Sequence, residues 1–76
     1  MKKIYSFTYR PFFETLKEKG ISQNKFMLDN ELSTAVMDRL RHNKNMTLMT
    51  IMDLMGMLGV KDIKKIVEIV VTVVEE

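Results

Sequence analysis

The sequence contains no cysteine, which excludes a disulfide framework, a thiol nucleophile and a cysteine-based metal site. Such a chain is compatible with a reducing compartment, and we take the cytoplasm as its expected location. The single histidine, His42, has no cysteine and no suitably spaced acidic residue beside it in sequence, so we expect no metal site.

Long hydrophobic runs and catalytic motifs are also missing. The longest near-apolar stretch, residues 66–74, is interrupted by Glu68 and is far shorter than the roughly 20 residues that span a bilayer. The basic residues at the start of the chain are followed by polar residues from position 5 onwards, and not by the apolar segment of a signal peptide. There is no Gly-rich phosphate loop and no Ser/His/Asp arrangement. We therefore expect no membrane partner, no enzyme activity, no cofactor and no small-molecule ligand.

What is present is a short chain with ordinary hydrophobicity and an uneven charge distribution. Its 76 residues, 46% of them hydrophobic, predict one folded domain over residues 1–76. A domain of this size without disulfides or metal is marginal, which favours support from a partner chain. The net charge of the chain is +2, but it is unevenly distributed. Residues 1–45 contain nine basic and five acidic residues, a net charge of +4, whereas residues 46–76 contain three basic and five acidic residues, a net charge of −2.

The chain reads as a helical bundle over residues 11–66 between two terminal strands. Alternation of Tyr5, Phe7 and Tyr9 with small polar residues predicts a strand within residues 1–10. The β-branched residues near the end of the chain predict a second strand within residues 67–76. The apolar residues at positions 63, 66, 67, 70 and 74 also fit a helical stripe. We expect the two strands to pair antiparallel.

Cap residues and apolar spacing place the helices. The first is expected from Pro11 to about Lys19, ended by Gly20. Further helix N-caps are predicted at Ser22, Ser33 and Thr47. The helix that begins after Thr47 is expected to end at Gly59. Asp62 is expected to begin one more helical turn, which carries Ile63 and Ile66. Core candidates on the first three helices are Phe12, Phe13, Leu16, Phe26, Met27, Val36, Met37 and Leu40.

The helix after Thr47 is expected to bury one stripe of apolar side chains. That stripe consists of Leu48, Ile51, Met52, Met55 and Leu58. Methionines at positions 46, 49, 52, 55 and 57 also allow an adaptable binding groove, a reading that exposure of Met49 or Met57 would favour.

The second and third helices have helix-turn-helix spacing, since Phe26, Leu32, Met37 and Leu40 set two short helices across a tight turn with one inner face. Residues 21–58 resemble the Cro/repressor-type (XRE-family) helix-turn-helix domain without a gap. The similarity is greatest to a small bacterial subgroup with a Tyr9-Arg10-Pro11-Phe12 start, the tract from Leu16 to Ser22 and the tract from Leu40 to Lys44. The resemblance covers about residues 9–67.

The turn departs from the family pattern. Met27 and Glu31 stand where the family usually has a small residue and Gly, and Asn30 replaces an apolar residue. The turn must therefore adapt without the usual left-handed glycine.

The resemblance implies a four- to five-helix lambda-repressor-like bundle that binds DNA, with the helix from about Ser33 to Arg41 in the major groove. Thr34 and Ala35 would approach base edges, and Arg39 guanine or phosphate. The DNA-contacting residues so implied are Ser22, Gln23, Ser33, Thr34, Ala35, Arg39, Arg41, His42, Asn43 and Lys44. Tyr5, Phe7 and Tyr9 could stack on bases, but packing onto the core is the favoured reading.

The C-terminal strand carries apolar residues on both faces, with Ile69, Val71 and Val73 on one of them. A sheet edge left uncovered there would pair with a second chain, so we expect a homodimer through these residues. Two copies would place their recognition helices about 34 Å apart on a palindromic operator.

Two functional hypotheses follow. The first is a sequence-specific transcriptional regulator, a repressor of its own or a neighbouring gene, of the kind found in phages, mobile elements and bacterial chromosomes. The alternative is a protein interaction module on the same scaffold, binding through the methionine-rich helix or the terminal strand.

Overall fold

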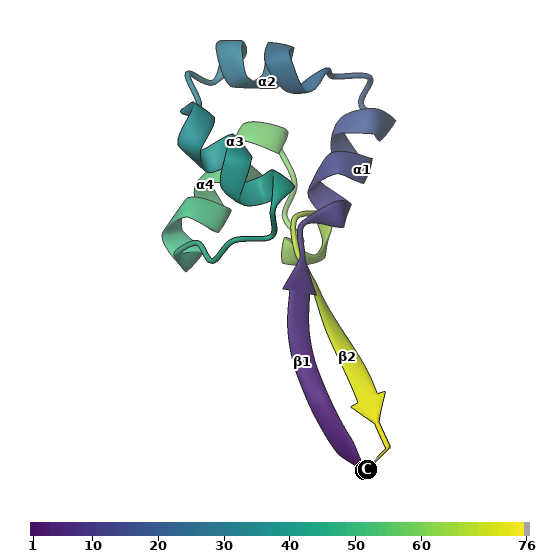
Figure 1. The fold of residues 1–76 in the computed structure, drawn as a ribbon. Coiled ribbons are helices and arrows are strands. Elements are labelled where there is room, and N and C mark those ends of the chain that lie inside the picture. Colours follow the sequence, from purple (N-terminus) through teal and green to yellow (C-terminus); the bar gives the residue numbers. More distant parts are fainter. Residues whose placement is uncertain (76) are drawn as a thin grey trace.

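The computed structural model describes residues 1–75 as a helical body with a projecting two-stranded arm (Figure 1). The elements are β1 (Lys2–Thr8), α1 (Arg10–Glu18), α2 (Gln23–Asp29), α3 (Thr34–Arg41), α4 (Leu48–Leu58), the 3-10 turn η1 (Ile63–Lys65) and β2 (Glu68–Val74). The arm makes the molecule elongated, with extents of 48 × 23 × 20 Å. A small helix-turn-helix bundle with paired terminal strands is thereby confirmed.

The predicted caps form in the structure. The side-chain oxygens of Ser22, Ser33 and Thr47 each accept a hydrogen bond from the backbone N–H three residues later, at 3.1, 3.2 and 3.2 Å. Each bond satisfies one of the N–H groups that have no partner within a helix. Gly59 ends α4 in the left-handed conformation (φ +70°), as expected for a C-terminal glycine.

The turn between α2 and α3 keeps a left-handed residue although glycine is absent. Glu31 adopts φ +51°. The backbone N–H of Leu32 then donates to the carbonyl of Met27 at 2.9 Å, and the Asn30 amide donates to the carbonyl of Phe26 at 2.9 Å. A non-glycine residue in this conformation costs roughly 1–2 kcal/mol. The turn geometry is therefore held by side-chain and backbone hydrogen bonds at the expense of local strain.

The core joins all four helices, the residue before α1 and the segment before β2. Its members are Tyr9, Phe12, Leu16, Phe26, Met37, Leu40, Ile51, Leu54, Leu58 and Ile66. The rings of Phe12 and Phe26 meet edge to face, with centroids 5.4 Å apart, which fixes α1 against α2. Phe13, Met27 and Val36 pack partly buried at its margin.

The predicted core stripe of α4 is wrong at two positions. Leu48 and Met52 are 61% and 56% exposed, whereas Leu54, absent from that stripe, is fully buried. At about 100° per residue, Leu54 lies about 60° from Ile51 on one side and Met52 about 100° on the other. Packing against the rest of the core buries the face of α4 that contains Leu54 and leaves the face that contains Met52 in solvent. Leu48 lies in the first turn of α4, which the core does not cover.

The three aromatic residues of the N-terminal strand do not share one environment. Tyr9 is buried and Phe7 is partly buried, their rings meeting edge to face with centroids 5.4 Å apart. Tyr5 is 67% exposed, which corrects the expectation that it packs onto the core. It lies opposite Val71, in the middle of the arm. The helices do not reach this part of the arm (Figure 1).

The arm is an antiparallel pair whose register runs from Lys2 opposite Val74 to Thr8 opposite Glu68, so the predicted pairing of the two terminal strands is confirmed. Directly opposed residues share a face of the sheet. One face, here termed the apolar arm face, therefore carries Tyr5, Phe7, Ile69, Val71 and Val73, with Lys3 at the tip.

Two contacts fix the arm to the helical body at its base. The buried hydroxyl of Thr15 lies 2.8 Å from the carbonyl oxygen of Pro11 and 3.0 Å from that of Lys65, which ties α1 to η1. The guanidinium of Arg10 lies 3.9 Å from the carboxylate of Glu68, the first residue of β2. Both strands therefore leave the body from one fixed point.

Within residues 1–75, no helix is long and apolar enough to cross a membrane. Nor do three or more His, Asp or Glu side chains among these residues gather closely enough to hold a metal ion.

Candidate nucleic-acid interface

Helix α3 presents a polar outward face because its apolar residues turn inwards. Met37 and Leu40 are fully buried. At about 100° per residue, Thr34, Asp38, Ala35 and Arg39 then fall within an arc of about 140° on the opposite side. All four are exposed, and we term them the outward face of α3. Three of them are residues predicted to approach DNA, so the structure brings these together on one accessible surface.

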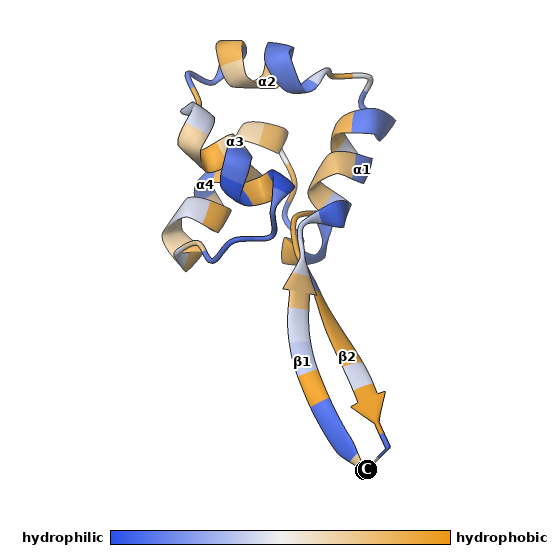
Figure 2. Ribbon diagram, viewed as in Figure 1, coloured by the Kyte–Doolittle hydropathy of each residue, from blue (hydrophilic) through white to orange (hydrophobic). Residues whose placement is uncertain are grey.

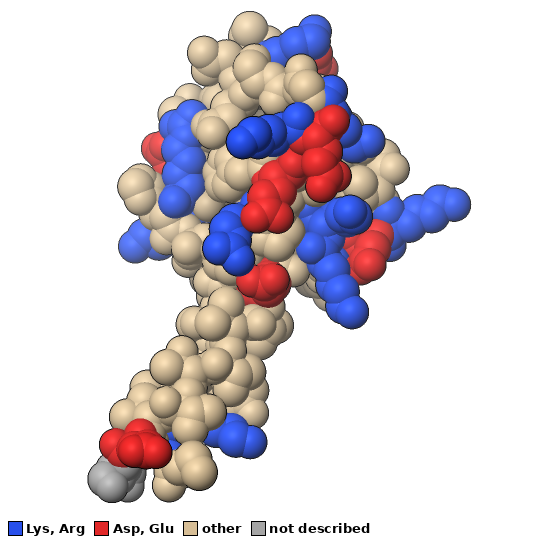
Figure 3. Space-filling model, turned by 90° about the vertical axis from the view of Figure 1, so that its right-hand side faces the viewer, with Lys and Arg blue, Asp and Glu red and all other residues tan. Residues whose placement is uncertain are grey.

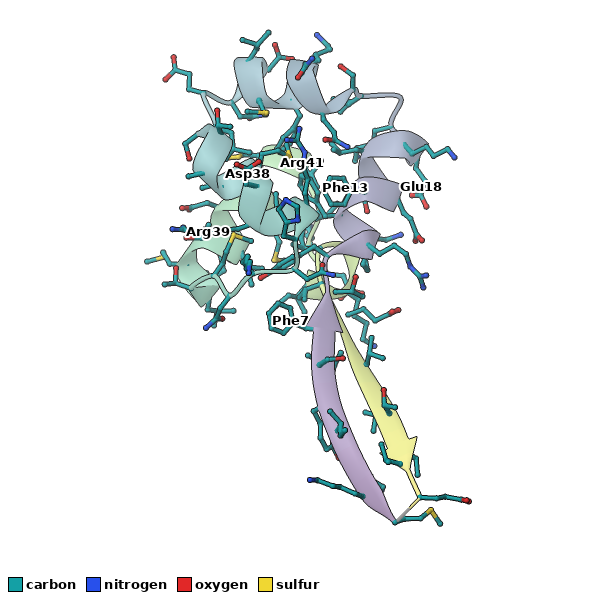
Figure 4. The ribbon with its side chains drawn as sticks, viewed as in Figure 1. Phe7, Phe13, Glu18, Asp38, Arg39 and Arg41 are labelled. Carbon is teal, nitrogen blue, oxygen red and sulfur yellow. The ribbon has the colours of Figure 1, made fainter. Side chains whose placement is uncertain are left out.

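The last turn of α3 is tied to the start of α2. The Arg41 guanidinium donates from Nε to the side-chain oxygen of Gln23 at 3.1 Å and from Nη1 to the carboxylate of Asp38 at 3.4 Å. Figure 4 shows Arg41 on the side of α3 that faces α2. Three of the predicted contact residues, Ser22, Gln23 and Arg41, therefore form one exposed group at the junction of the two helices.

The C-terminal end of α3 gathers the basic groups of this helix. Ser33 is the exposed N-cap, while Arg39 and Arg41 lie in the last turn and His42 is the C-cap. Cations in the last turn of a helix interact favourably with its negative end. The basic side chains that are predicted to contact DNA thus also stabilise the helix that carries them.

The loop after α3 is held in place by the residue that joins β1 to α1. Asn43 has φ +51°, and its side-chain oxygen accepts the backbone N–H of Tyr9 at 2.9 Å. The phenol of Tyr9 donates to the carbonyl oxygen of Lys44 at 2.7 Å. The Lys44 backbone N–H donates in turn to the carbonyl of Arg39 at 2.8 Å. Asn43 therefore serves the loop conformation through its oxygen, and Lys44 is fixed with its side chain exposed.

Burial gives Tyr9 a stable role as a hydrogen-bond donor. The side chain is 1% exposed, and removal from water raises the pKa of its phenol above the usual value of 10.0. The hydroxyl is consequently protonated at neutral pH and donates to Lys44 throughout that range.

The roles of two residues at this site were not identified from the sequence. Asp38 lies on the outward face of α3, and its spacing of four from Thr34 is the signal that indicates it. Tyr9 supports the loop through contacts across 34 and 35 positions in the chain, and no local pattern predicts such pairings.

Charges elsewhere on the body are arranged differently. On the α1 side, Figure 3 shows acidic and basic side chains intermingled. Exposed ion pairs there join Arg10 to Glu14 at 3.5 Å and, on α2, Lys25 to Asp29 at 3.2 Å. Such pairs largely cancel each other's field. The residues predicted for the dimer interface lie on β2 of the arm, where Ile69 follows the Glu68 that is paired with Arg10 and Val71 and Val73 lie further towards the tip.

Comparison with known protein families gives a match over most of the chain. The family model for a Cro/C1-type HTH DNA-binding domain matches residues 14–71. The matched segment runs from α1 into β2 and contains every residue of the candidate interface except Tyr9. No curated protein and no solved structure matches the chain significantly.

Proposed function

Since the chain belongs to the Cro/C1-type helix-turn-helix DNA-binding domain family, which is not a family of enzymes, we propose that it is a sequence-specific regulator of transcription that inserts α3 into the major groove. The observation that carries this proposal is the outward face of α3. It holds Thr34, Ala35, Asp38 and Arg39 in one exposed arc, next to the basic groups of its last turn and of the loop that follows.

Each residue of the outward face offers a different contact to a base edge. Arg39 is suited to guanine or to a phosphate, and the hydroxyl of Thr34 to either a donor or an acceptor. Ala35 can contact a thymine methyl group, and the carboxylate of Asp38 can accept a hydrogen bond from cytosine N4. A short residue such as Ala35 discriminates little, so DNA shape contributes to the choice of site.

The groups around α3 supply contacts to phosphates. Ser22 and Gln23 lie beside Arg41 at the α2 junction, and His42, Asn43 and Lys44 follow α3 in the loop that Tyr9 holds. Ser33 caps α3 and keeps its hydroxyl hydrogen free to donate. These contacts fix the register of the protein on the duplex.

Selection of a preferred duplex from a random pool tests the proposal. We expect one enriched site, and replacement of Arg39 or Lys44 by alanine should weaken binding to it. Removal of one phosphate contact should reduce the slope of log K against log salt by about 0.9. Lys61→Ala, an exposed basic residue between α4 and η1, is the matched control and should change the slope little. The absence of any enriched site, with no effect of the two substitutions, would refute this function.

We infer further that the regulator is a repressor that acts as a homodimer through the arm, with Ile69, Val71 and Val73 at the interface. Occupation of an operator by a small domain blocks access to a promoter without any further activity. A reporter gene placed downstream of the selected site should be expressed less when the protein is present. Higher expression would indicate an activator instead.

The exposed side chains of α4 favour a second candidate function, a protein interaction module. Leu48, Met49 and Met52 lie uncovered on its first turns. If no duplex is enriched, and substitution of Met49 or Met52 abolishes association with a partner protein, this second function replaces the first.

A further inference from the structure

Asp38 is an acidic residue in the middle of a surface that is otherwise neutral or basic. At about 100° per residue, it lies about 40° around the helix from Thr34 and about 60° from Ala35. Figure 4 shows Asp38 between Arg41 and Arg39, and Figure 2 shows strongly hydrophilic residues in the second half of α3. A duplex that receives α3 in its major groove therefore meets this carboxylate near the centre of the contact.

A carboxylate in this position is unfavourable unless a group of the DNA donates a hydrogen bond to it. Phosphates are negative, and the major-groove edges of guanine and thymine present acceptors. Cytosine presents an amino group at N4, whereas adenine presents one at N6 beside the acceptor N7. A carboxylate thus repels guanine and thymine and accepts a hydrogen bond best from cytosine. An unpaired charge that meets the wrong partner is a general source of specificity.

The carboxylate of Asp38 is held by one of its two oxygens. Nη1 of Arg41 donates to Oδ1 at 3.4 Å, and the side chains of Asp38 and Arg41 are 56% and 40% exposed. Within residues 1–75, no side chain donates to Oδ2. One oxygen is therefore paired with a cation, which offsets part of the repulsion from the phosphates, and the other is free to accept from a base.

Arg41 is itself held by α2. Its Nε donates to the side-chain oxygen of Gln23 at 3.1 Å, so the guanidinium bridges the first residue of α2 and the carboxylate of α3. A guanidinium has five N–H groups, and three remain for a phosphate. The same side chain can therefore orient Asp38 and contact the DNA backbone.

We propose that Asp38 is the residue of α3 that selects a cytosine in the binding site, and that Arg41 and Gln23 position its carboxylate. The inference deepens the proposed function and rests on it. Asp38 contacts the base, whereas Arg41 and Gln23 act through Asp38 and are positioning residues. Guanine or thymine at the same position lowers the affinity about tenfold. One carboxylate faces one base pair, so this preference is confined to one position of the site.

Selection from a random duplex pool, carried out with native protein and with Asp38→Asn, tests the inference. Native protein should enrich cytosine at one position. Asp38→Asn should change the preference at that position to adenine, because an asparagine amide pairs with N6 and N7 of adenine. In competition between two duplexes that differ only there, the native preference of about tenfold for cytosine should be lost or reversed. The other positions should keep their preferences.

Arg41→Ala and Gln23→Ala test the positioning. Each should relax the cytosine preference several-fold at the position that Asp38→Asn changes. Lys44→Ala is the comparison, since loss of a phosphate contact alone should weaken binding to both duplexes equally and leave their ratio unchanged. A merely structural or phosphate-binding role for Arg41 would not change this ratio.

Asp29→Asn on α2 is the matched control for the change of charge. Asp29 is also an exposed carboxylate, and it pairs with Lys25 at 3.2 Å as Asp38 does with Arg41. This variant should keep the native base preferences. Because exposed ion pairs contribute little to stability, all of these variants should fold, and circular dichroism checks that they do.

Three results would overturn the inference. They are an unchanged cytosine preference in Asp38→Asn, equal weakening of its binding to all sequences, and the loss of a guanine preference in its place, which would show that Asp38 acts through Arg41 alone. All three leave the proposed function intact, because native protein still selects a duplex. If native protein enriches no duplex, the proposed function fails and this inference fails with it.

Discussion

Replacement of Tyr9 by phenylalanine isolates the hydrogen bond that joins the arm and α1 to the loop after α3. The change removes the phenol that donates to the Lys44 carbonyl at 2.7 Å and retains the buried ring. A neutral hydrogen bond contributes about 0.5–1.5 kcal/mol net. Water can reach the Lys44 carbonyl in its exposed loop, so we expect a loss of about 1 kcal/mol in the free energy of unfolding.

That energy corresponds to a measurable shift in melting temperature. An unfolding entropy of about 2.1 cal/mol/K per residue gives about 160 cal/mol/K for 76 residues, so 1 kcal/mol lowers Tm by about 6 °C. In the variant, the loop after α3 also has to be ordered when it binds a phosphate of the DNA. If the same 1 kcal/mol is lost on binding, the affinity for the selected duplex falls about fivefold.

Differential scanning calorimetry and a DNA titration at fixed salt measure the two effects. Tyr5→Phe is the control, since Tyr5 is exposed on the arm and its variant should match the native protein in both assays. A Tm within about 2 °C of native together with an affinity within about twofold would refute the reasoning that Tyr9 positions the loop.

Three further predictions concern stability. Because burial raises the pKa of the Tyr9 phenol, the folded protein keeps a proton that the unfolded chain releases above about pH 10. This contribution to stability is complete below about pH 10 and is lost above it, so the Tm difference between native protein and Tyr9→Phe should narrow as the pH rises above about 10. Glu31→Gly should raise the urea midpoint by an amount equivalent to about 1 kcal/mol, since glycine adopts φ +51° without strain; an unchanged or lower midpoint contradicts this. Leu54→Ala should lower the free energy of unfolding, measured by chemical denaturation, by about 2–5 kcal/mol, and Met52→Ala should lower it by less than about 0.5 kcal/mol. A larger loss for Met52→Ala than for Leu54→Ala would show that Met52 belongs to the core.

The helix boundaries could be predicted from local chemistry alone. Ser22, Ser33 and Thr47 cap helices wherever their hydroxyls reach an N–H three residues later, which depends on a few consecutive residues. The exposed positions of α3 follow in the same way, from the spacing of Met37 and Leu40. The candidate contact residues came from the family resemblance.

The phase of α4 could not be predicted from its sequence. A run of methionines, leucines and isoleucine on adjacent arcs allows more than one buried stripe, because local hydrophobicity is similar for each. Contact with the rest of the core selects Leu54 and leaves Met52 in solvent. Tyr5 was misjudged for the same reason, since alternation along β1 does not reveal how far the arm extends from the body.

The sequence by itself determined the N-caps of α2, α3 and α4, the glycine that ends α4, and that α2 and α3 form a helix-turn-helix unit, while the β-branched residues after position 66 favoured a strand over a helical stripe. These properties depend on caps, apolar spacing and β-branched residues, which act over a few positions in the chain. Only the tertiary structure decided that Tyr9 holds the loop at Asn43 and Lys44, and that β2 leaves apolar side chains exposed along the arm. The contacts of Tyr9 and the pairing of β2 with β1 join residues more than 30 positions apart, and their energies exist only once the chain has packed.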